Sequence, residues 1–262
     1  RHFFLSQVYR DNYDAALENF PLINSQINIT QVEVWVTNRQ ASTDNFRNIV
    51  AISDIGENDP TNIAGTGVFP SGGVQQDPSN QSNNLFNLFT ATNPIREIST
   101  ISSEIGPSST YQLSQGRDYS VLENARKLLP SEYVVHPQLG YISLNRRLGE
   151  SDVLAVAYEY TITGSTTVNK VGELTTDGVV APKNLIVKLL RSEIINTTIP
   201  LWDLMMKNIY SLGAYQMSQE GFRFELLYND DATGVPINVL QNAATAGVSD
   251  RTLLNIFNLD NL

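Results

Sequence analysis

The feature that most restricts the fold is an alternation of apolar and polar side chains over 27–37 (INITQVEVWVT). Val32, Val34 and Val36 fall on one side of an extended chain, and the residues between them fall on the other. A period of two residues is typical of a strand in a sheet with one apolar side. We therefore predict a strand over 27–37 and a continuation of the β pattern over 49–52.

Further strand patterns lie in the second half of the chain. Pro137, Gly140 and Gly149 separate three strand-like runs, so that 132–163 predicts an antiparallel β-meander. Two more strands are predicted over 184–191 and 222–229.

Short helices are predicted over 9–20, 119–129, 200–212 and 250–257. In the first two segments apolar residues recur at spacings of three and four, and a proline follows each segment. Asp11 is the candidate N-cap of the first helix, and Ser249 or Asp250 that of the last. Pro200 and Gly213 suit the two ends of the third.

A polar segment over about 54–93 interrupts these patterns. It is rich in Gly, Pro, Asn and Ser, and its apolar anchors are Val68-Phe69 and 85–89. We predict a long loop, and we expect 60–84 to be poorly ordered because few apolar contacts offset the chain entropy.

These elements predict a mainly β fold with a few short helices, arranged as antiparallel sheets or sandwich-like units with long loops. We expect two units. Residues 1–112 would form a β-rich unit with the N-terminal helix and the long loop, and 113–262 an α+β unit with the meander and the helix over 200–212.

Composition excludes several classes of function. The 262 residues carry 17 Lys and Arg against 27 Asp and Glu, a net charge of −10. A nucleic-acid partner is not expected, because phosphate binding needs clustered basic residues. The chain has no cysteine, which excludes disulfides and thiolate chemistry. No apolar run approaches the about 18 residues of a membrane-spanning helix. The first residue is Arg1 and not Met, and no basic and then apolar targeting segment precedes the first predicted helix. We therefore expect the chain to start within a longer protein.

The two histidines are the first candidates for chemistry. His2 and His136 are far apart in the sequence, and neither has a Ser or Asp partner at the spacing of a known motif. His136 could be a general base or a lone metal ligand, but its place before Pro137 favours a turn residue. We assign it no role.

Carboxylates and glycines give no stronger signal. Asp230-Asp231 and the segment 54–59, which includes Glu57 and Asp59, could bind calcium or act as acid and base, but 54–59 lacks the alternating acids of an EF-hand loop. The glycines over 65–67 and 72–73 are not followed by the Lys of a phosphate loop. We predict no enzyme, and no catalytic, cofactor-binding or metal-binding residue.

Aromatic side chains allow two interpretations. Trp35, Tyr141, Tyr158 and Trp202 could stabilise the core, which is the usual place of aromatic residues on alternating strands. They could instead line a sugar-binding platform. The alternative function is therefore a cell-surface adhesin or a glycan-binding β module.

Long strings of this sequence resemble one family. Residues 9–21 leading into 29–38, and 47–51, resemble the SprA (Sov) family, and 139–145 with 153–160 is similar to the same family in the same order. The similarity lies in long strings that are not a general motif, and it covers most of the chain apart from 60–93.

The resemblance implies a role in type IX secretion and gliding motility of Bacteroidetes-type bacteria. Members of the family are very large outer-membrane β-barrel translocons that export folded cargo proteins. This chain would be a soluble insertion between barrel strands, at the cell surface or in the periplasm, with a structural, gating or cap role. Its partners would be the rest of the barrel protein, secretion-system subunits and exported cargo.

Overall fold

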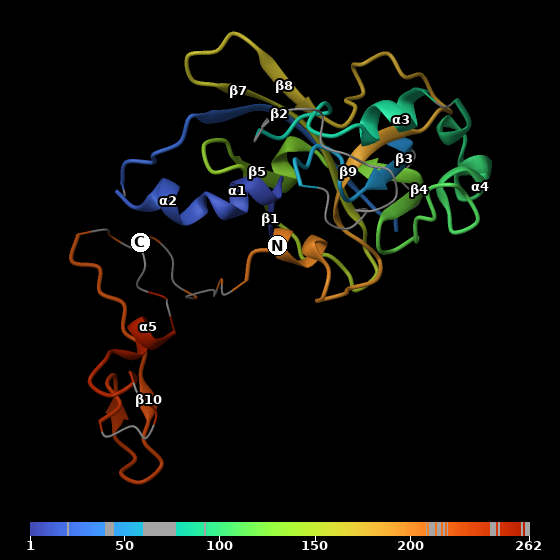
Figure 1. Cartoon of the computed structure of the whole chain (residues 1–262). Helices are drawn as coiled ribbons and strands as arrows, with labels where there is room; N and C mark the ends of the chain where they lie inside the picture. The colour runs from blue at the N-terminus through green and yellow to red at the C-terminus, as the bar shows by residue number, and fades with distance from the viewer. Residues whose placement is uncertain are drawn as a thin grey trace.

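The computed structural model describes residues 1–19, 21–39, 45–59, 77–91, 93–207, 220–241 and 247–257, with the single positions 209, 213, 216, 218, 245 and 259. Within these residues the fold is mainly β with a few short helices, as predicted. Figure 1 shows a main body that holds the large sheet and a C-terminal segment that lies apart from it.

The strands are β1 (His2–Phe4), β2 (Ile27–Val36), β3 (Phe46–Ile52), β4 (Tyr119–Lys127), β5 (Tyr133–His136), β6 (Tyr141–Leu144), β7 (Leu154–Ile162), β8 (Val168–Val171), β9 (Leu185–Arg191), β10 (Tyr228–Asn229) and β11 (Pro236–Ile237). The α-helices are α1 (Gln7–Asp11), α2 (Tyr13–Leu17), α3 (Leu85–Ala91), α4 (Ile101–Ile105) and α5 (Leu253–Ile256). The 3-10 helices are η1 (Asn93–Arg96), η2 (Ile98–Thr100), η3 (Pro130–Glu132) and η4 (Pro200–Leu204).

The larger sheet closes on itself as a small barrel. Its strands follow the order β2, β4, β3, β9, β7, and β7 pairs back with β2 from Ile27 to Val36. The other edge of β7 pairs with β9 near Leu154 and with β8 from Tyr158 onward. The β3–β9 pair is parallel and the others are antiparallel. The closing contact between β2 and β4 is short, because these strands pair only at Trp35 with Lys127 and at Val36 with Arg126.

Both faces of the barrel wall are buried over much of its length. All side chains from Leu185 to Leu190 of β9 are buried, as are Glu33 to Val36 at the end of β2. The prediction of one apolar side for β2 is therefore too simple. Phe89 of α3 and Ile105 of α4 belong to the same buried cluster, and Figure 1 shows both helices beside β3, β4 and β9.

A smaller sheet, in the order β1, β6, β5, packs beside the barrel. The β5–β6 hairpin confirms the first part of the predicted meander, with Gly140 in its turn at a φ of +64°. The third predicted strand forms as β7, but its place in the meander is wrong, because β7 pairs with β2, β8 and β9 in the barrel.

The predicted helix over 119–129 is wrong, because the segment forms β4. Arg47 pairs with Ala125 and Ile49 pairs with Leu122. Two steps along β3 therefore correspond to three steps along β4, so β4 carries one extra residue as a bulge. Asn124 lies in this bulge with a φ of +53°, and its N–H donates to Asn48. The extra residue separates apolar positions by three, which imitates helical spacing.

The other predicted helices are shorter than expected. The segment 9–20 forms two helices, α1 and α2, that meet at Asn12, and Asp11 ends the first of them. The helix expected over 200–212 is only η4, because Met205 is extended and pairs with Phe3; 208 and 210–212 lie outside the described residues. Thr252 caps α5, in place of Ser249 or Asp250.

The expected strand over 222–229 shrinks to β10, which pairs only with β11 among the described elements. The long loop predicted over 54–93 ends in α3, because the apolar anchors of 85–89 form that helix. Residues 60–76, which include most of the segment expected to be poorly ordered, lie outside the described residues. The expected unit boundary at 112/113 falls between α4 and β4, and strands from both sides of it share the barrel.

Candidate functional site

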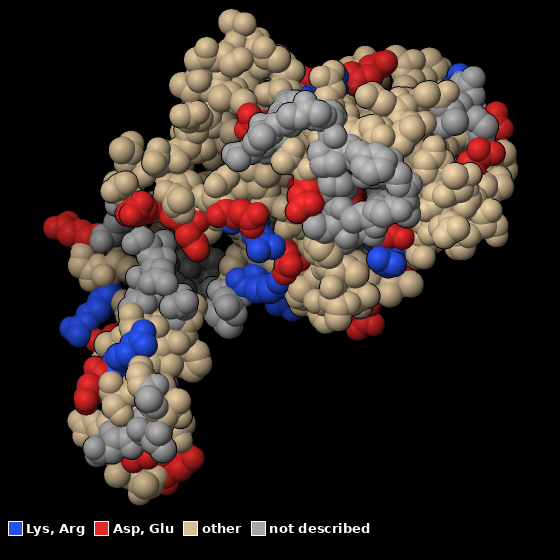
Figure 2. Space-filling view, viewed as in Figure 1, with Lys and Arg blue, Asp and Glu red and all other residues tan. Residues whose placement is uncertain are grey.

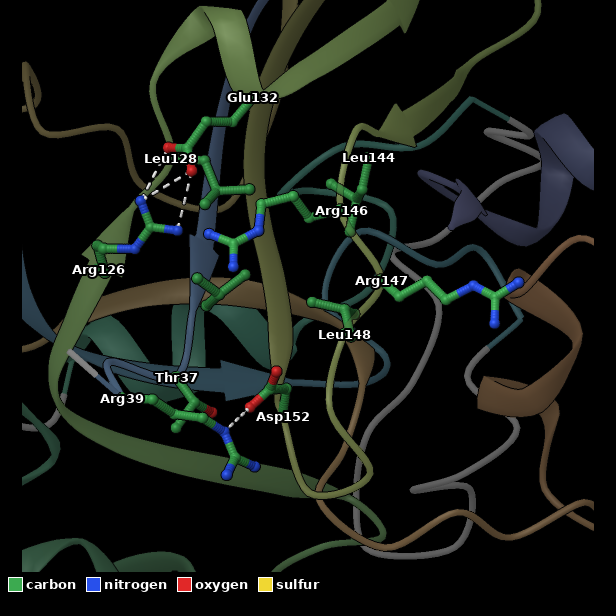
Figure 3. A pocket seen from close by; sticks show the side chains of 11 residues that line it. Thr37, Arg39, Arg126, Leu128, Glu132, Leu144, Arg146, Arg147, Leu148 and Asp152 are labelled. Carbon is green, nitrogen blue, oxygen red and sulfur yellow. Dashed lines mark hydrogen bonds and ion pairs between the residues drawn. The ribbon is translucent and has the colours of Figure 1, made fainter.

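A hollow of about 130 Å³ lies between the ends of β2 and β4, η3 and the segment that follows β6. Its polar lining includes Arg39, Arg126, Arg146, Arg147, Glu132 and Asp152, and its apolar lining is Val36, Leu128, Leu144 and Leu148. We call it the arginine hollow (Figure 3). Four arginines and two acidic residues line it, in a chain of net charge −10.

One ion pair forms a wall of the hollow. Arg126 of β4 donates to both carboxylate oxygens of Glu132, at 2.8 to 3.1 Å. Glu132 also accepts the Leu129 N–H at 2.9 Å, which holds η3 at the end of the strand. The hydrogen bonds from Arg126 hold the pKa of Glu132 below its usual value, so this carboxylate is ionised at neutral pH.

A second ion pair lies on the opposite side, as Figure 3 shows. Arg39, beyond the end of β2, pairs with Asp152 and donates to Ser151 at 2.7 Å. Asp152 also accepts the Gly149 N–H at 2.6 Å. Partial burial alone would raise the pKa of Asp152, but the hydrogen bonds from Arg39 and Gly149 outweigh it and lower that pKa.

The segment 145–152, which carries Arg146 and Arg147, is fixed from β9. Arg191 donates to the carbonyl oxygens of Gly149, Glu150 and Asp152 at 2.8 to 2.9 Å. A guanidinium group has five N–H donors in a planar fork, which suits several carbonyl oxygens at once. The backbone of this rim of the hollow is therefore held by the barrel.

Arg146 and Arg147 are the two lining arginines that take no part in the Arg126–Glu132 and Arg39–Asp152 ion pairs. Both side chains are exposed, and within the described residues neither forms an ion pair or a hydrogen bond. Figure 3 shows the Arg146 guanidinium inside the hollow, near the Arg126–Glu132 pair, and the Arg147 side chain pointing away from it. Guanidinium groups of this kind bind carboxylate and phosphate oxygens. Arg146 is therefore the lining residue best placed to contact an added anionic group.

Lys188 and Glu57 form an ion pair inside the barrel wall. Lys188 is fully buried, lies 2.6 Å from Glu57 and donates to the carbonyl oxygens of Ser53 and Ile55. Glu57 also accepts hydrogen bonds from the Ser6 hydroxyl at 2.9 Å and the Gln7 N–H at 3.2 Å. This network ties the start of α1 to β9 and the segment after β3.

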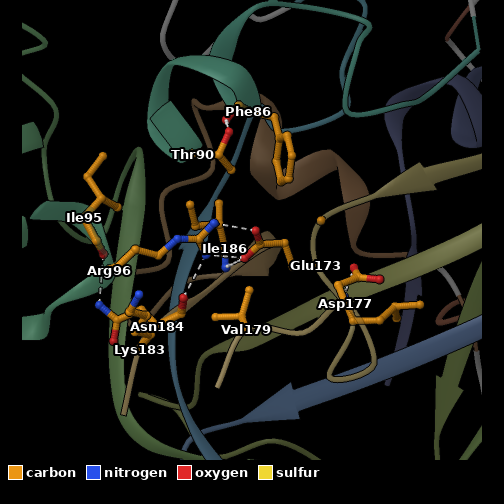
Figure 4. Close-up of polar contacts among 12 residues, drawn as sticks. Phe86, Thr90, Ile95, Arg96, Glu173, Asp177, Val179, Lys183, Asn184 and Ile186 are labelled. Atoms are coloured by element: carbon orange, nitrogen blue, oxygen red, sulfur yellow. Dashed lines mark hydrogen bonds and ion pairs between the residues drawn. The ribbon is translucent and has the colours of Figure 1, made fainter. Parts of the chain in front are cut away.

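A bidentate pair of Arg96 and Glu173 ties η1 to the barrel (Figure 4). Its two contacts measure 2.5 and 2.6 Å. Glu173 also accepts the Ile186 N–H at 2.9 Å, and Arg96 donates to the carbonyl oxygen of Asn184 at 3.0 Å. Every polar partner of this pair is therefore supplied by the barrel or its flanking segments.

Glu33 of β2 is the third buried carboxylate with a cation. It lies 2.5 Å from Lys127 of β4 and accepts the Thr175 N–H at 2.9 Å. The Lys127 ammonium also lies 5.9 Å from the centre of the Trp35 ring, an arrangement typical of a cation–π contact. Buried charges are tolerated when each is paired and hydrogen-bonded, as these are.

The two histidines lie close together, which their separation in the sequence did not indicate. Ser143 Oγ lies 2.7 Å from His2 Nδ1 and 3.3 Å from His136 Nε2, because β6 lies between β1 and β5. The His136 ring stacks on Tyr141 at 4.0 Å. Partial burial lowers the pKa of both histidines. His136 lies at the end of β5, next to the predicted turn.

Three of the four candidate carboxylates, Glu57, Asp230 and Asp231, accept hydrogen bonds within the fold. Glu57 is held by Lys188, and Asp59 is exposed. Asp230 accepts hydrogen bonds from Thr233, and Asp231 accepts the Tyr228 hydroxyl, so both acids support a local turn. Within the described residues, no group of three or more His, Asp or Glu side chains could hold a metal ion. The glycines at 65–67 and 72–73 lie outside the described residues.

Among the four aromatic side chains assigned to cores, Trp35 and Tyr158 are fully buried. Tyr141 is partly buried and packs against the same cluster. Trp202 is also partly buried, with the Lys207 ammonium 5.3 Å from the centre of its ring. Buried rings cannot form a sugar-binding platform, so Trp35 and Tyr158 do not support the glycan-binding alternative.

Within the described residues, no helix combines the length and the apolar character that crossing a membrane requires. The face drawn in Figure 2 is mostly uncharged, with acidic groups scattered over it and a group of basic side chains near its centre.

Comparison with protein-family models gave no match, and comparison with curated proteins gave none either.

Proposed function

We propose that this chain is a non-catalytic β module of a very large outer-membrane translocon resembling the SprA family. In this role it shapes the pore, its gate or its cap during type IX secretion and gliding motility. The exported cargo and other secretion-system subunits are its partners, and its position is on the extracellular side.

The observation that carries the proposal is where the family-like strings lie in the fold. Residues 29–38 form most of β2, 47–51 lie in β3, 139–145 contain β6, and 153–160 lie mostly in β7. The strands β2 and β7 pair with each other and close the barrel. Sequence similarity that falls on mutually paired core strands is expected when the fold itself is shared.

The buried ion pairs support a scaffold role. Lys188–Glu57, Arg96–Glu173 and Lys127–Glu33 join segments that are far apart in the sequence, and each has further hydrogen bonds. Paired buried charges hold segments in one arrangement, because displacing either partner leaves the other unpaired. A module built in this way presents its surface loops in fixed positions, which suits recognition of a partner protein.

Export in cells tests the proposal. In the bacterium that encodes this chain, deletion of the gene should leave cargo with a C-terminal secretion signal in the periplasm and stop gliding. Complementation with the intact gene should restore both. Normal export and motility in the deletion strain would contradict the proposal. A hydrolase activity that His136→Ala abolished would contradict the non-catalytic assignment.

A further inference from the structure

We propose that the arginine hollow binds a side-chain carboxylate of an acidic peptide segment, with Arg146 as its main contact. This inference goes beyond the translocon proposal and does not depend on it. It rests on the charge of the hollow, on the chemistry of its lining and on its size.

The first step is the charge that Arg146 leaves available. Arg126 is satisfied by Glu132, and Arg39 by Asp152, so these two arginines need no further anion. Arg146 forms no hydrogen bond or close ion pair within the described residues, although its charge also lowers the pKa of Glu132 and its guanidinium lies inside the hollow (Figure 3). Its parallel N–H groups match the two oxygens of one carboxylate.

The second step favours a carboxylate over a phosphate. Glu132 and Asp152 line the same hollow, and the lowered pKa of each keeps it ionised at neutral pH. A phosphate with nearly two negative charges would face both of these carboxylates. A carboxylate carries a single charge, which the single positive charge of Arg146 offsets.

The third step concerns the apolar lining. Val36, Leu128, Leu144 and Leu148 line the hollow together with the charged groups. An aliphatic stem or a neighbouring apolar residue of a peptide would lie against these side chains. A volume of about 130 Å³ suits one side chain, because pockets for drug-sized ligands measure about 300–1,000 Å³.

The fourth step is that the hollow is already formed. Arg191 holds the backbone of 149–152 through three carbonyl oxygens, and the Leu129–Glu132 hydrogen bond fixes η3 on the other side. Binding therefore needs little ordering of the rim, which is the main entropic cost of recognition by a loop.

The experiment measures binding of a fluorescein-labelled hexapeptide of alternating Leu and Glu by fluorescence anisotropy at low ionic strength. The matched peptide replaces each Glu with Gln. We expect the Glu peptide to bind and the Gln peptide to bind at least about tenfold more weakly, because hydrogen bonds to charged groups contribute about that much.

Arg146→Gln should weaken binding of the Glu peptide by about tenfold or more. Arg147→Gln is the matched control, because it removes the same charge from the adjacent residue, whose side chain points away from the hollow (Figure 3). It should weaken binding by less than about threefold. Arg223→Gln, at an exposed side chain in the C-terminal segment, should leave binding unchanged.

Three results would overturn the proposal. The first is equal binding of the Glu and Gln peptides. The second is an equal loss in Arg146→Gln and Arg147→Gln, which would indicate general charge attraction. The third is displacement of the labelled peptide by inorganic phosphate at concentrations where acetate has no effect, which would indicate a phosphate site. Circular dichroism checks that each variant is folded. We expect all of them to fold, because the substituted side chains are exposed.

Discussion

At the scale of single residues, the sequence around Lys188 indicates that this lysine is buried but does not identify its acidic partner. A lysine within the apolar run of 185–190 indicates a buried cation, because an uncompensated charge would not be tolerated in that run. The sequence does not indicate which of the 27 acidic residues is its partner. Glu57 takes that place because the segment after β3 lies against β9, an arrangement that depends on the whole barrel.

Lys188→Met should lower the free energy of unfolding by about 3–5 kcal/mol, because it leaves Glu57 buried without its cation. Urea unfolding at pH 7, followed by tryptophan fluorescence, measures the change. Lys207→Met is the control, because Lys207 and Asp203 form an exposed pair whose loss costs about 0–1 kcal/mol. Equal effects of the two substitutions would contradict the buried network.

If Lys188→Met does not fold, the double variant Glu57→Gln/Lys188→Met gives a second measurement. It removes both charges, so part of the lost stability should return. A double variant that also fails to fold would contradict this explanation of the loss.

The His2–Ser143–His136 cluster predicts a dependence of stability on pH. The folded state lowers the pKa of both histidines from the usual 6.5, chiefly through partial burial. Below pH 6.5 the unfolded chain therefore binds protons more readily, and stability falls as the pH drops from 6.5 through the folded pKa values.

Urea midpoints of the wild type should decrease between about pH 7.5 and pH 5. The variant His2→Asn/His136→Gln should show a smaller decrease over the same interval, because it has no imidazole to protonate. Parallel curves for the two proteins would show that the histidines do not cause the effect.

At the scale of elements, strands with regular alternation could be predicted and irregular ones could not. The strands β2 and β9 follow the period of two residues or a continuous apolar run, and the structure confirms both. The bulge in β4 shifts the alternation at Asn124, so local spacing favours a helix there. Pairing with β2 and β3 decides the conformation, and such pairing is not visible in a short window.

Substitution of two glycines, Gly140 between β5 and β6 and Gly164 after β7, should change stability by different amounts. Gly140 and Gly164 both have positive φ angles, +64° and +86°. A Cβ on Gly140 would lie 2.3 Å from Cγ of the Tyr9 ring, whereas a Cβ on Gly164 would have nothing within 4 Å. Backbone strain applies to both positions, but steric overlap applies only to the first.

Gly164→Ala should therefore lower the free energy of unfolding by about 1 kcal/mol. Gly140→Ala should lower it by about 1–3 kcal/mol more, because Tyr9 has to move. Urea unfolding of both variants measures the difference. Equal losses would show that α1 does not pack against the hairpin as described.

At the scale of the whole molecule, the mainly β class could be predicted from composition and periodicity, but barrel closure could not. Closure needs β2 to pair with β7, more than 100 residues away, and nothing local specifies that partner. The arginine hollow has the same origin. Arg39, Arg126 and Arg146 come from separate segments, and no sequence pattern singled out any of them.

We propose that the chain belongs to an outer-membrane translocon and faces the cell exterior. Site-specific thiol labelling of the full-length protein in intact cells tests it most directly. The chain has no cysteine, so a single introduced thiol reports one position of this module. Leu22→Cys places the thiol at a site that is 72% exposed, and Ile186→Cys places the control at a fully buried site in β9.

In a cysteine-free background of the full-length protein, a membrane-impermeant maleimide should label Leu22→Cys on intact cells. Ile186→Cys should react only after denaturation. Labelling of Leu22→Cys that requires permeabilisation of the outer membrane would place the module in the periplasm and contradict the extracellular position. Labelling that requires rupture of the inner membrane would contradict the central claim.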